Sequence, residues 1–286
     1  MELLDGRLRL RDVVDAMDEG LRTTCRRWSW VGVLLLLAMP GRLALAHLLL
    51  ALWRLNDPRA HGDALTLLTS EWLGLWLIGL YGRQVFVRAC RVADGHGRWW
   101  EPLAVPPPLL LAHLVGATAI AFLFFALLWT VVIPPFLLPL AALTAIAPGI
   151  TPPAHGGIAL LTGPLRGIAR ILSPNGLLLV APAFAVALGL ALINLHLVTQ
   201  LGMWLAQLAV PPAVLANWDL LLSFDSPTYV TLLLAGASLA VEPFWLAVLN
   251  AVGGKVRSRS TGEDLSAWFA ALRMEQQTAQ RAEAQP

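Results

Sequence analysis

Residues 106–147 read PPPLLLAHLVGATAIAFLFFALLWTVVIPPFLLPLAALTAIA, 42 consecutive positions without an ionised side chain. This run belongs to a longer stretch, Leu103 to Trp218, in which the only ionised groups are Arg166 and Arg170. A water-facing surface cannot be built from such a stretch, because soluble domains carry about 25% charged residues. The stretch therefore decides the fold class, which is an all-α polytopic bundle of membrane-spanning helices.

The composition of the whole chain agrees with this class. Of the 286 residues, 57% are hydrophobic and 13% are charged, whereas a soluble domain has roughly 45–50% apolar residues. Such high hydrophobicity excludes disorder. The net charge of +2 gives no large basic field, so nucleic acid is excluded as a partner. The partner that this composition predicts is membrane lipid.

The apolar positions fall into blocks that can be compared with the roughly 20 residues a spanning helix needs. Four blocks have about the length of one span: 28–53, 65–87, 177–210 and 229–252. The block from Pro106 to Ala147 is about twice too long for one helix, and Ile133-Pro134-Pro135-Phe136 interrupts its middle. It forms either two short spans or one span followed by a re-entrant or interfacial piece.

Lysine and arginine counts separate these alternatives, because cytoplasmic loops are enriched in both residues. Residues 1–27, 88–105, 148–176 and 253–286 together hold sixteen, whereas the opposite loops hold only Arg54 and Arg59. We therefore expect six spans with both termini in the cytoplasm. Five spans, with 136–176 on a membrane surface, is the alternative. The expected division is a cytoplasmic segment 1–27, a transmembrane bundle 28–252 and a cytoplasmic segment 253–286.

Amphipathic helices are predicted in both cytoplasmic segments. Between Arg11 and Thr24, one face carries Val13, Val14, Met17 and Leu21 at helical spacing. Near the C-terminus, Ser260 and Glu263 have the spacing of a capping box. The helix that follows presents an apolar face formed by Leu265, Trp268, Phe269 and Leu272. This face either lies in the headgroup layer or is a docking surface for another protein.

Charges inside predicted spans are the one sequence feature that by itself suggests a functional site, because burying a charge in lipid is costly. Four residues qualify: Arg42, Glu71, Arg83 and Glu242. They form either structural ion pairs or a transport site for a proton or ligand. Since the first two spans are joined by a short loop, we expect them to be antiparallel neighbours with an ion pair between Arg42 and Glu71.

Motifs for catalysis or cofactor binding are missing from the sequence. There is no Gly-x-Ser-x-Gly elbow, no His-Glu-x-x-His and no phosphate-binding loop. The two intramembrane histidines, His113 and His196, have no second ligand at i+3 or i+4. We therefore expect neither enzymatic activity nor a metal or cofactor.

Three border segments resemble those of bacterial six-span proteins related to the membrane domain of glycerophosphoryl diester phosphodiesterase and to YciC-like proteins. The segments are Leu8-Arg9-Leu10-Arg11-Asp12-Val13-Val14-Asp15-Ala16 with Arg26-Arg27-Trp28-Ser29-Trp30, then Pro164-Leu165-Arg166-Gly167-Ile168-Ala169-Arg170, and Val256-Arg257-Ser258-Arg259-Ser260-Thr261-Gly262-Glu263-Asp264-Leu265. The resemblance implies six spans. It implies no hydrolase, because the phosphodiesterase chemistry of that family belongs to a separate soluble domain, for which this chain has no room.

These patterns together predict an integral inner-membrane protein without catalysis, acting as a scaffold or accessory subunit of an envelope complex. The alternative is a transporter of a small solute or of protons that uses Glu71 and Glu242.

Overall fold

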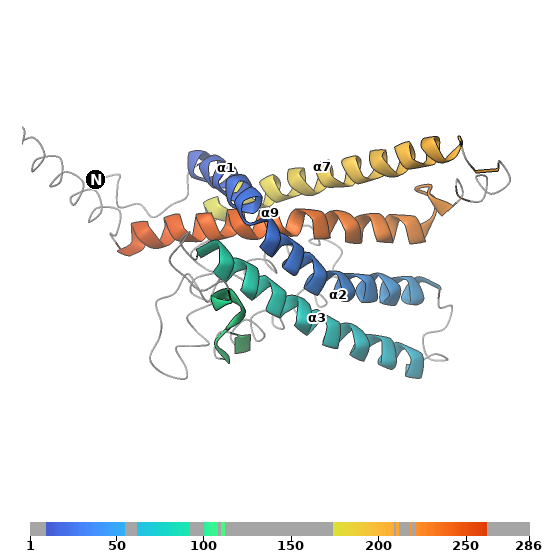
Figure 1. The fold of residues 1–286 in the computed structure, drawn as a ribbon, viewed down its shortest axis with the longest axis horizontal. Helices are drawn as coiled ribbons and strands as arrows, with labels where there is room; N and C mark the ends of the chain where they lie inside the picture. The colour runs from blue at the N-terminus through green and yellow to red at the C-terminus, as the bar shows by residue number, and fades with distance from the viewer. Residues whose placement is uncertain are drawn as a thin grey trace, which may run out of the picture.

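The structure is a computed structural model, and it describes residues 10–54, 62–91, 100–107, 110–111, 174–208, 210–211, 218 and 221–261. These residues form helices and connecting turns, and none of them lies in a strand. The helices are α1 (Leu10–Arg26), α2 (Trp28–Arg54), α3 (Gly62–Arg91), the short 3-10 helix η3 (Glu101–Leu103), α7 (Pro174–Ala206) and α9 (Pro227–Thr261). The described part of the chain is therefore all-helical, as predicted (Figure 1).

Three of these helices contain a segment that is long and apolar enough to cross a bilayer. The segments are Trp28–Leu48 in α2, Pro182–Ala206 in α7 and Pro227–Lys255 in α9. Helix α3, which covers the second predicted span, is also long, with 30 residues. The chain is thus compatible with a membrane protein. Of the predicted block Pro106–Ala147, all but four residues lie outside the described residues.

Helices α2 and α3 lie side by side and run in opposite directions (Figure 1). Their backbones approach closely at Gly41, where an added Cβ would lie 3.0 Å from the carbonyl oxygen of Leu75. At Gly82 an added Cβ would lie 2.9 Å from Cβ of Leu37. Because glycine has no side chain at these two points, the two helices can cross at short distance.

Helix α9 lies at the centre of the described bundle, between α7 and α2 (Figure 1). Its second half supplies Trp245, Leu246 and Leu249, which are all fully buried. The ring of Phe184 in α7 packs against that of Trp245, with 4.9 Å between the ring centroids. This half of α9 is therefore the surface on which the other helices assemble.

Helix α1 packs on α9 through a face of small residues. Val13, Ala16 and Gly20 are buried there, and a Cβ on Gly20 would lie 2.5 Å from Cγ2 of Val248. Val14 and Leu21, which share a face with Val13 in the sequence pattern, are each 56% exposed. The predicted apolar face is therefore divided, because the close contact with α9 selects the smaller side chains.

Candidate functional site

The candidate site is centred on Glu242, which lies near the middle of α9. At helical rise, Glu242 lies roughly 22 Å from Pro227 and roughly 20 Å from Lys255 along the helix axis. It therefore lies near the midpoint of the spanning segment Pro227–Lys255. Its side chain is 6% exposed. The next residue, Pro243, lies inside the helix and cannot donate a backbone hydrogen bond to the preceding turn.

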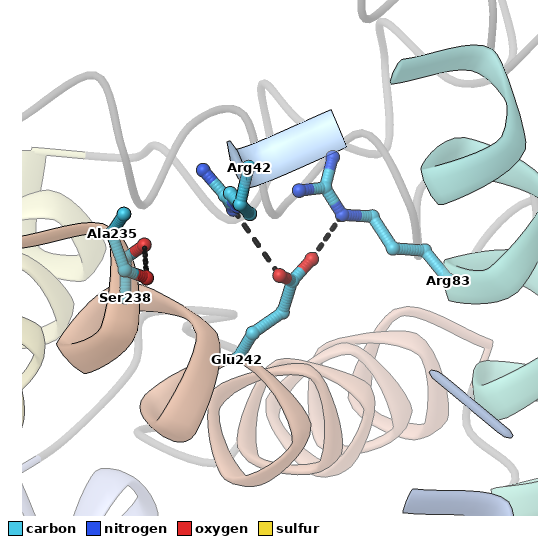
Figure 2. Close-up of polar contacts among 5 residues, drawn as sticks. All are labelled: Arg42, Arg83, Ala235, Ser238 and Glu242. Atoms are coloured by element: carbon cyan, nitrogen blue, oxygen red, sulfur yellow. Dashed lines mark hydrogen bonds and ion pairs between the residues drawn. The ribbon is translucent and has the colours of Figure 1, made fainter. Parts of the chain in front are cut away.

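Two arginines from two other helices meet this carboxylate (Figure 2). Nη2 of Arg42, on α2, lies 3.2 Å from Oε2 of Glu242. Nε of Arg83, on α3, donates a hydrogen bond to Oε1. The Arg83 side chain is 10% exposed, and that of Arg42 is 22% exposed. One carboxylate thus joins α2, α3 and α9.

Each arginine directly follows one of the two glycines at which α2 and α3 approach most closely. Gly41 precedes Arg42, and Gly82 precedes Arg83. Successive residues of a helix are rotated by about 100° around its axis. When a glycine faces the neighbouring helix, the next residue therefore points to one side of that helix. Here that direction is α9, which places both guanidinium groups against Glu242. A Gly-Arg pair within each of the predicted spans 28–53 and 65–87 is the sequence signal for this site.

The cluster contains two positive charges and one negative charge. In the middle of a spanning helix an arginine without a partner costs about 2.5–3.5 kcal/mol on insertion scales. Glu242 offsets part of this cost for both arginines, since each of its oxygens accepts from a different guanidinium group. The arrangement stabilises the contact of three helices and leaves one positive charge in excess.

The predicted ion pair between Arg42 and Glu71 is wrong. Arg42 binds Glu242, and Glu71 is exposed on α3. The register explains this, because Gly41 faces Leu75 and Arg42, one position later, is rotated away from α3. Of the four predicted intramembrane charges, the structure brings three together and leaves Glu71 apart.

Of the two candidate intramembrane histidines, the structure describes His196. This residue belongs to α7 and lies near the start of α9. Its Nδ1 is 2.7 Å from the hydroxyl of Tyr229, and its ring lies 4.5 Å from that of Phe224 between centroids. Within the described ranges, no group of three His, Cys, Asp or Glu side chains could hold a metal ion. His113 and the candidate docking face Leu265, Trp268, Phe269 and Leu272 lie outside the described residues.

Polar contacts gather at the opposite end of α9. Nζ of Lys255 lies 3.7 Å from a carboxylate oxygen of Asp15 in α1 and donates to the backbone oxygen of Asp12. Nε of Arg91 in α3 donates to Oδ1 of Asn250 at 2.8 Å. These contacts connect α1 and α3 to α9, and no local sequence pattern indicates their pairing.

The two cysteines differ sharply in environment. Cys25 is exposed, and Cys90, three residues after the predicted end of the second span, is largely enclosed. Burial raises the pKa of the Cys90 thiol to about 12, although the nearby Arg27 and Arg91 lower it. Because the thiolate is the reactive form, Cys90 is expected to be inert.

Comparison of this chain with protein-family models, with curated proteins and with solved structures finds no match.

Proposed function

We propose that this chain is an integral inner-membrane protein without catalysis of its own, acting as a scaffold or accessory subunit of an envelope complex. The observation that carries the proposal is the cluster of Arg42, Arg83 and Glu242. Within the described helices, these three charges are engaged with each other across α2, α3 and α9. Such an ion cluster fixes the relative positions of helices, which is what a frame for other proteins requires.

The transport alternative has less support from the same geometry. A transport site built on Glu242 needs its carboxylate to be available to a ligand or proton. Both oxygens are already engaged, one by Arg42 and one by Arg83. Glu71, the other acid of that hypothesis, lies apart from the cluster and is exposed.

The helix directions support a topology in which the chain enters and leaves the bundle on one side of the membrane. Helices α2 and α7 begin at the same end of the bundle, and α3 and α9 end there (Figure 1). Helix α3 thus ends, and α7 begins, at the same end of the bundle (Figure 1), which favours an even number of crossings between them. Five spans would need an odd number. Because 106–147 is long enough for two spans, we propose two crossings and a total of six spans.

We place the chain with the six-span proteins related to the membrane domain of glycerophosphoryl diester phosphodiesterase and to YciC-like proteins. The support is the three border segments and the agreement in proposed span number. The scaffold role fits a six-span domain that has no attached hydrolase.

The test of the proposed function is partner retention by the full-length protein. The parent, purified from its own membranes in mild detergent, should retain a membrane-protein partner at a fixed ratio by quantitative mass spectrometry. If the C-terminal face is the docking surface, Trp268→Ala with Phe269→Ala should lower that ratio at least about tenfold, as loss of two aromatic anchors does at protein interfaces.

The matched control is Gln276→Ala with Gln277→Ala, which changes polar residues of the same tail and should keep the partner. Retention by the aromatic variant would reject the docking face. A parent without any partner that moves a solute or protons in vesicles, with flux abolished by Glu242→Gln, would reject the scaffold role and favour transport.

A further inference from the structure

We propose that the excess positive charge of the cluster is neutralised by a carboxylate on a transmembrane helix of a partner protein, which binds at Arg42. This inference rests on the scaffold function proposed above and names the chemistry of its partner. The cluster contains Arg42, Arg83 and Glu242, and neither arginine contacts a second acidic side chain among the described residues.

Arg42 is the arginine with room for a further contact. Its side chain is 22% exposed, whereas those of Arg83 and Glu242 are 10% and 6% exposed. Figure 2 shows one nitrogen of the Arg42 guanidinium group pointing away from Glu242. A guanidinium group has five N–H donors, so Arg42 can bind a second carboxylate without releasing the first.

This chain has no acid of its own for that position. Apart from Glu71 and Glu242, every Asp and Glu lies within 2–19, 57–63, 94–101, 219–225 or 263–283. These segments lie outside the spanning helices or at their ends. Glu71 is twelve residues from Arg83 on the same helix, roughly 18 Å along its axis, and it does not pair with Arg42. The chain between Pro102 and Trp218, most of which the structure does not describe, contains no acid at all.

The surroundings of Arg42 decide between kinds of anion. It contacts Glu242, which lies roughly 20 Å from either end of the spanning segment Pro227–Lys255 at helical rise, too deep for a lipid phosphate at either surface. Its neighbours on α2, Met39 and Leu43, are exposed and apolar. An apolar surface with one deep cation is complementary to an apolar helix with one deep carboxylate, since intramembrane charges generally pair with one another.

The probe is a synthetic transmembrane helix of leucine and alanine with one glutamate at its midpoint, compared with the same peptide carrying glutamine. Binding to full-length protein in vesicles is measured by energy transfer between labels at mildly alkaline pH. The glutamate peptide should bind about five- to thirtyfold more tightly, the range seen for polar contacts between model membrane helices. Moving the glutamate to the end of the peptide should remove the preference.

The variants assign the effect to Arg42. Arg42→Gln should abolish the preference for glutamate, and Arg42→Lys, which keeps the charge, should retain part of it. Circular dichroism of both variants checks that the bundle is intact. Equal binding of the two peptides, or a preference that survives Arg42→Gln in a folded protein, would overturn the proposal.

Two further outcomes would also overturn it. If inorganic phosphate or acetate stabilises the parent but not Arg42→Gln, the site takes a free anion. If the protein forms a dimer that requires both Arg42 and Glu71, a second copy supplies the acid. None of these failures affects the retention of partners through the C-terminal face, so the scaffold function is tested separately.

Discussion

Two Gly-Arg pairs control where charge is buried in this protein. Gly41 and Gly82 allow α2 and α3 to approach closely, and the arginine after each glycine is rotated toward α9. Glu242 then receives one guanidinium group on each oxygen. Removing the carboxylate while keeping the side-chain shape would leave both arginines without their shared partner.

Glu242→Gln is therefore expected to lower the free energy of unfolding by about 3–5 kcal/mol, the usual effect of removing one partner from a buried ion pair. Thermal unfolding in detergent, followed by circular dichroism, measures the change. The matched control is Glu71→Gln, since Glu71 is exposed and surface substitutions usually change stability by less than about 0.5 kcal/mol. Equal unfolding temperatures for the two variants would show that the cluster does not hold the helices together.

At the scale of the helix, α1 has three different sides. Val13, Ala16 and Gly20 pack on α9, and the charged residues Asp15, Asp18 and Arg22 are exposed on another side. A third side exposes Leu10, Val14 and Leu21. One side of α1 thus packs on the protein, a second is charged and exposed, and a third is apolar and exposed. Such a helix suits the membrane–water interface. Its attachment to α9 depends on the smallest of these residues.

Gly20→Ala should detach or strain α1, because its Cβ would lie 2.5 Å from Cγ2 and 3.0 Å from the backbone nitrogen of Val248. Overpacking of this kind costs about 1–3 kcal/mol. Limited proteolysis should cut α1 faster in the variant, and the unfolding temperature should fall. In Gly32→Ala the new Cβ meets nothing within 4 Å, so its helix should be unchanged or stabilised by up to about 1 kcal/mol. A stable Gly20→Ala variant would contradict the observed packing.

Across the whole molecule, the two ends of the bundle differ in their chemistry. At one end, Lys255 and Asn250 of α9 bind α1 and α3. At the other, Tyr229 of α9 and His196 of α7 form a polar and aromatic contact. The basic residues at the first end agree with the proposed cytoplasmic orientation, because Lys and Arg favour the cytoplasmic side.

A thiol-labelling experiment tests this orientation in intact cells. Cys25 is exposed at the end proposed to be cytoplasmic, so an impermeant reagent should label it only after the cells are opened. Asp225→Cys in a Cys25→Ser background should label from outside. Asp225 is chosen because it is exposed. The neighbouring Ser226 is less suitable, because its Oγ accepts the backbone N–H of Tyr229.

Cys90 serves as the internal control of the same experiment. Its pKa of about 12 keeps the thiol protonated at neutral pH, so it should stay unlabelled on either side until the protein is denatured. Labelling of Cys25 from outside intact cells would reverse the proposed orientation.

The sequence by itself determined the all-helical class, because long apolar runs without charge can satisfy their backbone only as helices in lipid. It also identified Arg42, Glu71, Arg83 and Glu242 as unusual, since burial of charge is costly wherever it occurs. It could not choose their partners. That choice depends on the rotation and axial position of three helices, which the close contact of Gly41 with Leu75 sets. The pairing of Arg42 with Glu242, and the division of α1 into three sides, were decided only by the tertiary structure, because residues 200 positions apart in the chain meet through packing that no local pattern encodes.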